Sequence, residues 1–204
     1  MSLQDDYLKA CIPEPYRILG QRLRPFSLGH SFVLNRMGNP FVVADSGRVP
    51  SLGDLYFAVW VCRQDYHSVL KGLHNGTFVK DIKWLKLVSF LRNTELAKIR
   101  MAQYIIAAGK PPNIWQSSSK DSKKMTMPYL LWLKFCMMSK LGYTSRDVMN
   151  LPLSEAVWLS IAYSESEGGA SFQTDREAEL IKIAKQMGEQ EALARKEPVL
   201  NDGR

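Results

Sequence analysis

The sequence predicts a mainly α-helical protein with one small β-hairpin near its N-terminus. Apolar residues recur at helical spacing through most of the 204 residues. Capping residues precede several of these segments, and glycine or proline follows them, as expected at helix ends. Hydrophobic residues make up 46% of the chain, enough for a packed core rather than a disordered chain.

The chain begins with a short predicted helix and a predicted hairpin. Residues 3–11 are expected to form the helix, which ends before Pro13 because proline restricts the residue that precedes it. Residues 16–26 alternate around Gly20 and Gln21, which predicts a hairpin or an extended arm. An isolated hairpin is weak, so this one needs helices to pack against.

Three helical segments follow in the N-terminal half. Ser27 caps a helix that ends at residues 38–40, and Ser51 with Asp54 caps one that runs from 52 to about 71. A longer stretch covers 79–108 and can divide at residues 93–94. The expected inward residues are Leu28, Phe32, Val33 and Met37, then Leu55, Val59 and Cys62, and finally Trp84, Leu87, Val88, Leu91, Leu96, Ile99 and Ile106.

Residues 111–126 read as a linker, because they combine prolines, serines and lysines without periodicity. This linker divides an N-terminal helical body with a hairpin or arm, residues 1–110, from a C-terminal helical unit, residues 127–204. The linker is short enough for both parts to share one core. No internal repeat is apparent.

The C-terminal unit is predicted to contain three linked helices and a charged final helix. Residues 129–141 are almost all apolar, so we expect this helix to be buried on most sides. Gly142 suits a left-handed helix end, and Thr144 caps a short helix over 145–149. A third helix ends at residues 168–169. The final helix, 175–194, begins at a capping box of Thr174 and Glu177, and its narrow apolar stripe is either a solvated flank or a docking arm.

The net charge of +7 is unevenly placed, because acidic residues gather after residue 143. A basic body with an acidic end fits nucleic acid, an acidic protein partner, head-to-tail self-association, or a solvated surface without a ligand. Three separated cysteines predict buried free thiols rather than disulfides or metal ligands. No secretion signal or membrane-spanning run is visible, so we expect a soluble cytoplasmic protein.

No recognisable catalytic pattern is present. His67 and His74 lack the spacing of a zinc motif, and His30 is better placed to cap or pack a helix. Glycine-rich phosphate loops are absent, and Glu155 has no second convergent group. We therefore expect no catalytic residue, no cofactor and no metal.

Nucleic-acid binding has some support from Lys80, Lys83 and Lys86, which recur beside Trp84. Trp84, however, begins an apolar stripe, which is typical of core. Residues 129–168 have some helix-turn-helix character, but the helix that would read DNA is apolar and acidic. The balance argues against nucleic acid as the main partner.

Two segments resemble tail assembly chaperones of long-tailed phages and prophages, and chaperone-like proteins of the same gene neighbourhood. The C-terminal segment carries Gly142, Tyr143, Thr144, Asp147, Val148, Leu151, Pro152, Glu155 and Ala156. The N-terminal segment carries Arg24, Pro25, Phe26, Ser27, Leu28, Gly29, His30, Leu34, Gly38, Pro40 and Phe41. Together the two segments cover about a third of the chain.

The resemblance implies a non-enzymatic helical assembly factor that binds the tape measure protein, and in some cases the major tail protein, before the tail tube polymerises. Met and aromatic side chains adapt to varied apolar surfaces, so they are the expected contacts. These interface residues are Trp132, Phe135, Met137, Met138, Trp158 and Tyr163, each of which could instead be ordinary core. A structural virion protein and a basic nucleic-acid-binding accessory protein remain the alternatives.

Overall fold

The computed structural model describes residues 3–12, 15–43, 47–90, 92–112, 114–116, 127–173 and 175–194. The fold is mainly α, as the sequence predicts. The helices are α1 (Leu3–Cys11), α2 (Leu28–Arg36), α3 (Leu52–Cys62), α4 (Tyr66–His74), α5 (Phe78–Ser89), α6 (Thr94–Gly109), α7 (Tyr129–Ser139), α8 (Ser145–Asn150), α9 (Leu153–Ser166) and α10 (Asp175–Ala194). The strands are β1 (Arg17–Ile18), β2 (Gln21–Arg22), β3 (Ile114–Gln116) and β4 (Ala170–Phe172).

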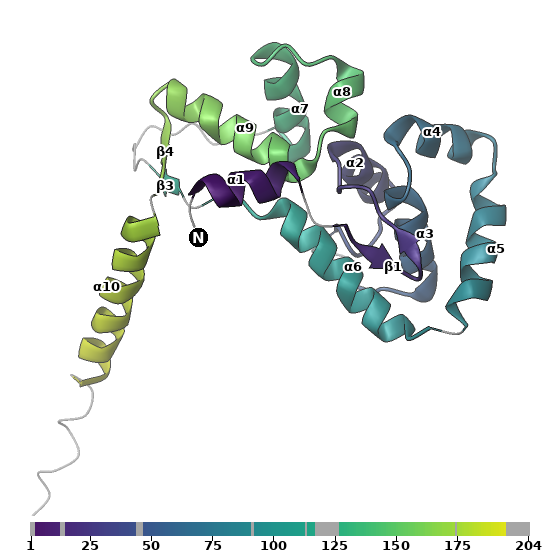
Figure 1. The fold of residues 1–204 in the computed structure, drawn as a ribbon, viewed down its shortest axis with the longest axis horizontal. Coiled ribbons are helices and arrows are strands. Elements are labelled where there is room, and N and C mark those ends of the chain that lie inside the picture. The colour runs from purple at the N-terminus through teal and green to yellow at the C-terminus, as the bar shows by residue number, and fades with distance from the viewer. Residues whose placement is uncertain are drawn as a thin grey trace, which may run out of the picture.

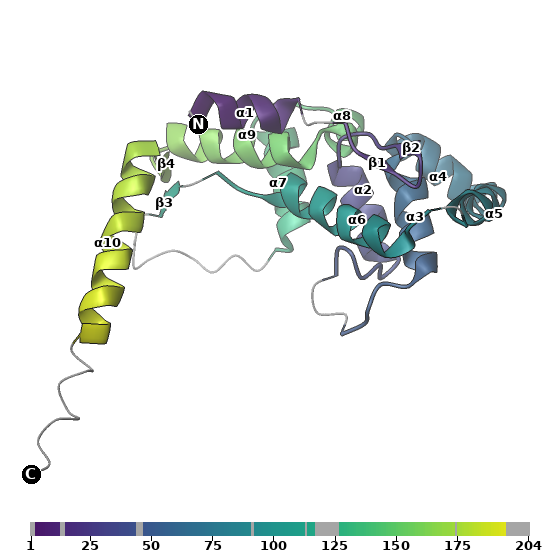
Figure 2. The ribbon, with the colours of Figure 1, turned by 60° about the horizontal axis from the view of Figure 1, so that its bottom comes forward.

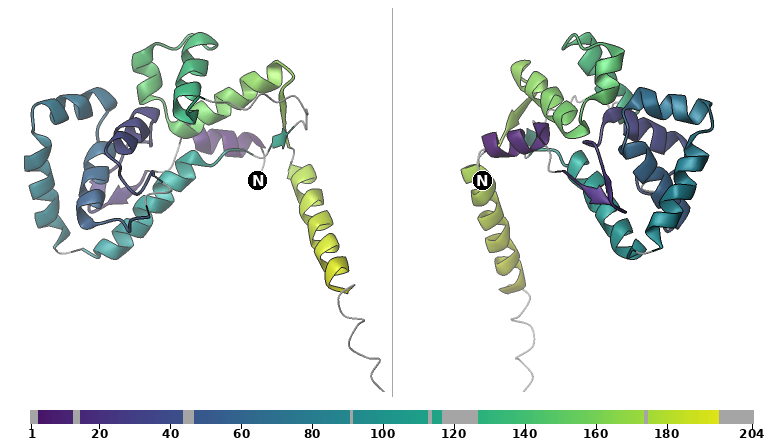
Figure 3. Two further views of the ribbon diagram at one scale, coloured as in Figure 1. Left: turned by 180° about the vertical axis from the view of Figure 1, so that it is seen from behind. Right: turned by 45° about the vertical axis from the view of Figure 1, so that its right-hand side comes forward.

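Helices α2 to α6 and the β1–β2 hairpin form one end of the molecule, and α7, α8 and α9 pack beside them (Figure 1). Helix α1 lies along α9, so the two ends of the helical body meet. Helix α10 points away from the rest of the chain (Figures 1 and 2), and the views in Figure 3 show the same from two further sides. The model therefore presents a packed body and one projecting helix.

A single hydrophobic cluster connects both sides of the predicted linker. It includes Ile18 of the hairpin, Trp60 of α3, Met137 of α7 and Val157 of α9. Trp60 is fully buried, and its indole N–H donates to the Asp81 carboxylate at 3.0 Å. The N- and C-terminal parts therefore share one core. Among the described residues, no helix is both long and apolar enough to cross a membrane.

The predicted hairpin is confirmed. Strands β1 and β2 pair antiparallel, with Arg17 opposite Arg22 and Ile18 opposite Gln21. The turn residues Leu19 and Gly20 have φ values of 51° and 77°, which is the left-handed backbone of a two-residue hairpin turn. Ile18 and Leu19 are buried, so the hairpin gains the packing that it needs.

The single helix expected over 52–71 is wrong, because the chain forms α3 and α4 instead. Arg63 ends α3, and Asp65 begins α4 as its N-cap, accepting from the Ser68 N–H at 3.0 Å. The Asp65 side chain accepts from the Ser68 N–H, which in a continuous helix would instead donate to the backbone carbonyl four residues earlier. The apolar period continues across the break, which is why periodicity alone does not reveal it.

The inward faces expected for the 79–108 stretch are also wrong, although its division at Asn93 is confirmed. Trp84 and Leu87 are exposed, whereas Leu85 is fully buried. On α6, the side chains of Leu96, Ile99 and Ile106 face solvent, whereas those of Ala97, Met101 and Tyr104 face the core. Leu91 and the side chain of Val88 lie outside the described part. Both helices carry apolar residues on two faces, so spacing cannot select the buried one.

Three further expectations need correction. Met37 at the end of α2 is exposed, and α7 is not buried on most sides, since its buried residues are Leu133, Cys136 and Met137. The predicted linker contains β3, which pairs antiparallel with β4 through Ile114 and Phe172. Residues 117–126 and the predicted cap Thr174 lie outside the described residues.

Candidate functional site

An apolar stripe on the outer face of α7 is the strongest candidate for a docking surface. Leu131, Phe135 and Met138 stand at i, i+4 and i+7 and are 46%, 53% and 39% exposed. We call these three residues the α7 stripe. In the first turn of the same helix, the rings of Tyr129 and Trp132 are stacked with centroids 6.0 Å apart. A helix with this pattern can bind an apolar helix of another chain.

The structure separates the six predicted interface residues into two groups. Phe135 and Met138 belong to the α7 stripe, and Trp132 is half-buried next to it. Tyr163 of α9 is half-buried, with the Lys140 ammonium 5.8 Å from its ring centroid. These residues can contribute to a surface.

Met137 and Trp158 do not belong to this surface. Met137 is fully buried, and Trp158 is 7% exposed. The ring of Trp158 stacks on Phe172 with centroids 5.4 Å apart and meets Tyr7 edge-on at 5.6 Å. Their prediction as interface residues is therefore corrected, and the alternative of ordinary core applies to both. The sequence reasoning missed Leu131, whose spacing to Phe135 and Met138 was the signal that could have found it.

The turn after α7 fixes how α7 stands on α8. Gly142 has a φ of 73°, the left-handed conformation predicted for it. The Tyr143 N–H donates to the Met137 carbonyl at 3.1 Å, and Thr144 accepts from the Asp147 N–H at 3.2 Å. These two bonds give partners to one carbonyl at the end of α7 and one N–H at the start of α8, so they help to set the orientation of α7 on α8.

Residues 24–41 and residues 142–156 meet directly in the fold. The Leu28 N–H donates to the Leu151 carbonyl at 3.1 Å, and the Leu153 N–H donates to the Phe26 carbonyl at 2.8 Å. Ser27 and Pro152 form an antiparallel bridge between these two bonds. We call this contact the motif junction. It ties the start of α2 to the turn between α8 and α9.

Gly29 is required at the motif junction because nothing larger fits. A Cβ at this position would lie 2.5 Å from the Met149 carbonyl oxygen and 2.6 Å from the Tyr66 ring. Both distances are far below a normal contact. The Tyr66 N–H also donates to the Asn150 side chain at 3.0 Å, so α4 joins the junction. Helix α2 therefore approaches α8 and α4 at backbone contact distance.

His30 holds the other side of the same helix start. It is 2% exposed, and its Nδ1 accepts from the Ser27 N–H at 3.1 Å as part of a capping box. Its Nε2 lies 2.7 Å from the Gln64 carbonyl oxygen, to which a neutral imidazole with the proton on Nε2 donates. Burial lowers the pKa of His30 to about 4. The capping and packing role expected for His30 is therefore what the geometry shows.

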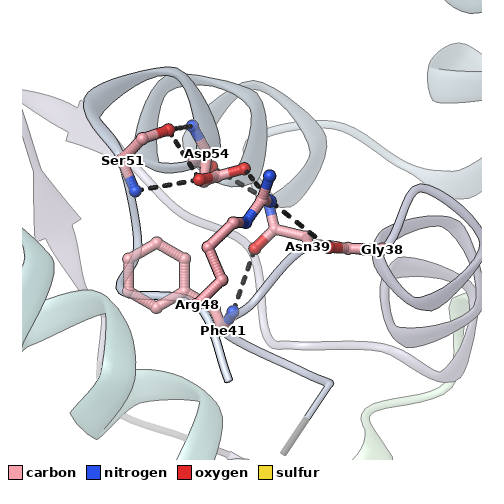
Figure 4. A network of polar contacts seen from close by, with 6 residues as sticks. All are labelled: Gly38, Asn39, Phe41, Arg48, Ser51 and Asp54. Carbon is pink, nitrogen blue, oxygen red and sulfur yellow. Dashed lines mark hydrogen bonds and ion pairs between the residues drawn. The ribbon is translucent and has the colours of Figure 1, made fainter. Parts of the chain in front are cut away.

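A polar network joins the end of α2 to the start of α3 (Figure 4). The buried Asn39 donates from its side chain to the Asp54 carbonyl at 3.0 Å and accepts from the Phe41 N–H at 3.1 Å. The Asp54 carboxylate accepts from the Ser51 N–H at 2.8 Å and from Arg48 at 2.8 Å. This network fixes α3 against α2, which in turn supports the motif junction.

Replacing Asn39 with alanine should therefore lower the free energy of unfolding by about 2 kcal/mol, because it removes two part-buried hydrogen bonds and leaves the Phe41 N–H without its side-chain acceptor. Urea unfolding of the two proteins measures this loss. The exposed Asn35 of α2 provides the control, since Asn35→Ala should change stability by less than about 0.5 kcal/mol. Equal effects at the two sites would contradict the role given to Asn39.

The described residues offer little for acid–base or metal chemistry. No group of three or more His, Cys, Asp or Glu residues in that part of the chain could hold a metal ion. Burial raises the pKa of the Cys62 thiol to about 12, which makes it a poor nucleophile. Burial also raises the pKa of the partly exposed Glu155 carboxyl.

Helix α10 presents a second apolar stripe. Leu180, Ile183 and Met187 are all exposed on a helix that projects from the body. Both expectations for this helix, a solvated flank and a docking arm, stay open.

Comparison of the chain with protein family models, curated proteins and solved structures found no match.

Proposed function

We propose that this chain is a non-enzymatic tail assembly chaperone of a phage or prophage, and that the α7 stripe binds the tape measure protein. The exposed α7 stripe carries the proposal, because Phe135 and Met138 were expected contacts and stand at helical spacing on one open face. The resemblance of the adjoining turn, from Gly142 to Ala156, supplies the class of partner. A tape measure protein is a long helical chain with apolar faces, which matches an apolar helix surface.

The size of the α7 stripe favours weak, repeated binding. Burying a leucine, phenylalanine or methionine side chain is worth about 1.5–3 kcal/mol, and these three are already partly buried. Association also costs translational freedom and side-chain ordering, so a single contact of this kind is weak. Many copies along one long partner would bind through avidity and could be released as the tube grows.

The placement of α7 supports the proposal further. Its inner side is anchored by Leu133, Cys136 and Met137, and its end is fixed by the turn at Gly142. A rigid element presents the α7 stripe without losing much conformational entropy on binding. The projecting α10 would supply a second contact to the same partner or to a neighbouring copy.

The test is co-expression with the tape measure protein encoded in the same genomic neighbourhood. We expect the tape measure protein to stay soluble and to co-elute with several copies of this chain. The double variant Phe135→Ser/Met138→Ser should abolish co-elution, because it removes most of the α7 stripe. The matched control Ile99→Ser/Ile106→Ser removes two exposed apolar residues of α6 and should keep it.

Two outcomes would contradict the proposal. If the tape measure protein stays insoluble when it is co-expressed with the wild-type chain, it is not the partner that we propose. Equal loss in the two double variants would remove the α7 stripe as the contact. Mass spectrometry of purified particles adds a separate check, because a chaperone should be absent from them and a structural virion protein should be present.

A further inference from the structure

A basic cavity lies between the β1–β2 hairpin and the first turns of α6. Its volume is about 470 Å³, within the range of small-ligand sites. Arg17 of β1, Arg92 of the connection between α5 and α6, and Arg100 of α6 line it, and Ile18 and Leu96 form part of its apolar wall. We infer that this cavity binds a phosphate-bearing anion, and we call it the arginine pocket. This inference does not rest on the proposed function.

The three arginines have no acidic partner in the described part of the chain. No aspartate or glutamate lines the arginine pocket. The ion pairs in the described residues are Arg48–Asp54, Arg63–Asp81 and Lys98–Glu95, so none of them involves these side chains. Glu95, three residues after Arg92, is engaged by Lys98 at 2.9 Å. Among the described residues, no acidic side chain therefore neutralises the positive charge of the pocket.

The hairpin register adds a fourth positive charge. Arg22 stands directly opposite Arg17 in the β1–β2 pair, and like charges in that position repel each other. Gly20, in the turn, allows Arg92 to approach: a Cβ there would lie 3.2 Å from a guanidinium nitrogen. Arg17 and Arg92 therefore both line the pocket beside the hairpin turn, where a bound anion would offset their positive charge.

The chemistry of the lining favours phosphate over other anions. Guanidinium groups bind phosphate oxygens through two parallel hydrogen bonds, and several can share one dianionic group. A single carboxylate would satisfy one arginine and leave the others unpaired. The apolar wall can contact the sugar or base that accompanies a phosphate. The phosphate can belong to a small molecule or to a nucleic-acid backbone, and the experiment separates these sources.

The test uses the full chain with two probes, sodium pyrophosphate and a fluorescein-labelled single-stranded oligonucleotide. Isothermal titration measures the first and fluorescence anisotropy the second, at low salt and at physiological salt. The triple variant Arg17→Ala/Arg92→Ala/Arg100→Ala should raise the dissociation constant of whichever probe the wild type binds by about tenfold or more. The control Arg36→Ala/Arg146→Ala/Arg176→Ala removes the same charge outside the pocket and should change it by less than about twofold.

Each result has a defined meaning. Pyrophosphate binding that the triple variant loses supports a site for a small phosphate compound. Oligonucleotide binding that the triple variant loses, and that pyrophosphate displaces, supports a backbone phosphate in the same pocket. Equal weakening in both triple variants would overturn the inference in favour of diffuse charge, and so would no binding of either probe at millimolar concentration. Thermal unfolding checks that each variant is folded.

Discussion

Alanine at Gly29 is expected to lower the free energy of unfolding by about 2 kcal/mol, although alanine is normally the better helix former. Its Cβ would meet the Met149 carbonyl oxygen at 2.5 Å and the Tyr66 ring at 2.6 Å. Since the first contact is backbone, relief requires α2 to move away from α8. Overpacking of this kind typically costs 1–3 kcal/mol, and here it must also offset the roughly 1 kcal/mol that alanine gains within a helix.

The chain contains an unusually close control for this substitution. Ser27 and Ser51 both cap helices, and both are followed by leucine and glycine. Gly53 therefore has the same helical position as Gly29, but a Cβ there would have only an ordinary contact, 3.6 Å from the Ser51 hydroxyl. Gly53→Ala should raise stability by about 0.5–1 kcal/mol. Urea unfolding of both variants should thus give effects of opposite sign.

The comparison discriminates between two accounts of the N-terminal motif. If it were only a capping signal, the two alanine variants would behave alike, because both capping boxes are complete. If the glycine is needed for close approach, only Gly29→Ala should destabilise the protein. Stabilisation by both variants would show that α2 is not packed against α8 as described.

The N-cap residues of the chain predicted the starts of several helices, because a cap depends only on residues close to it in the sequence. Ser27, Asn93 and Thr144 all cap helices where the sequence indicated. The inward faces of α5 and α6 were mispredicted because both helices have apolar residues on two sides. Leu85 is buried while Leu87 is exposed, and only the neighbouring helices decide between them. The pairing of Ile114 with Phe172 was missed because its partners are far apart in the sequence.

The six predicted docking residues divide between surface and core for a related reason. Met137 and Met138 are adjacent, so they point to different sides of α7, and the sequence alone does not say which side is covered. Packing against α9 and α8 buries Met137 and leaves Met138 in the α7 stripe. Trp158 is covered in part by Phe172 of β4, which follows the predicted helices. A reading of residues 128–168 alone therefore cannot place it in the core.

The motif junction also changes what the family resemblance supports. Residues from both resembling segments bond to each other there, through Leu28 with Leu151 and Phe26 with Leu153. Phe26, Leu28 and Leu151 are thus explained by assembly of the fold. The residues of the α7 stripe precede Gly142 and lie outside both segments. The proposed contact can therefore be altered without changing the motif junction.

Lowering the pH from 6.5 to 4 is expected to destabilise the protein by about 3 kcal/mol through His30 alone. Its pKa is lowered to about 4 chiefly by burial, against an ordinary value of 6.5. In this range the unfolded chain binds a proton that the folded chain does not, so acid favours unfolding. The contribution is fully present above pH 6.5 and is lost as the pH falls to about 4. Each unit of difference between the folded and unfolded pKa corresponds to about 1.4 kcal/mol in the free energy of unfolding.

The variant His30→Gln isolates this contribution. Glutamine can accept from the Ser27 N–H as capping-box residues do, but it does not titrate. Losing the bond to the Gln64 carbonyl should cost about 1–2 kcal/mol at pH 7. The Glu155 carboxyl, whose pKa burial raises, acts in the opposite direction with pH but is present in both proteins. Its effect therefore cancels in the difference.

The two stability curves should consequently cross. Urea unfolding at pH 7 should find the wild type more stable than His30→Gln. At pH 4 the order should reverse, because only in the wild type does unfolding expose an imidazole that then takes up a proton. Parallel curves from pH 7 to pH 4 would mean that His30 is solvated or already charged in the folded state. That result would also contradict the neutral tautomer, with Nδ1 accepting from Ser27 and Nε2 donating to Gln64, on which the helix start depends.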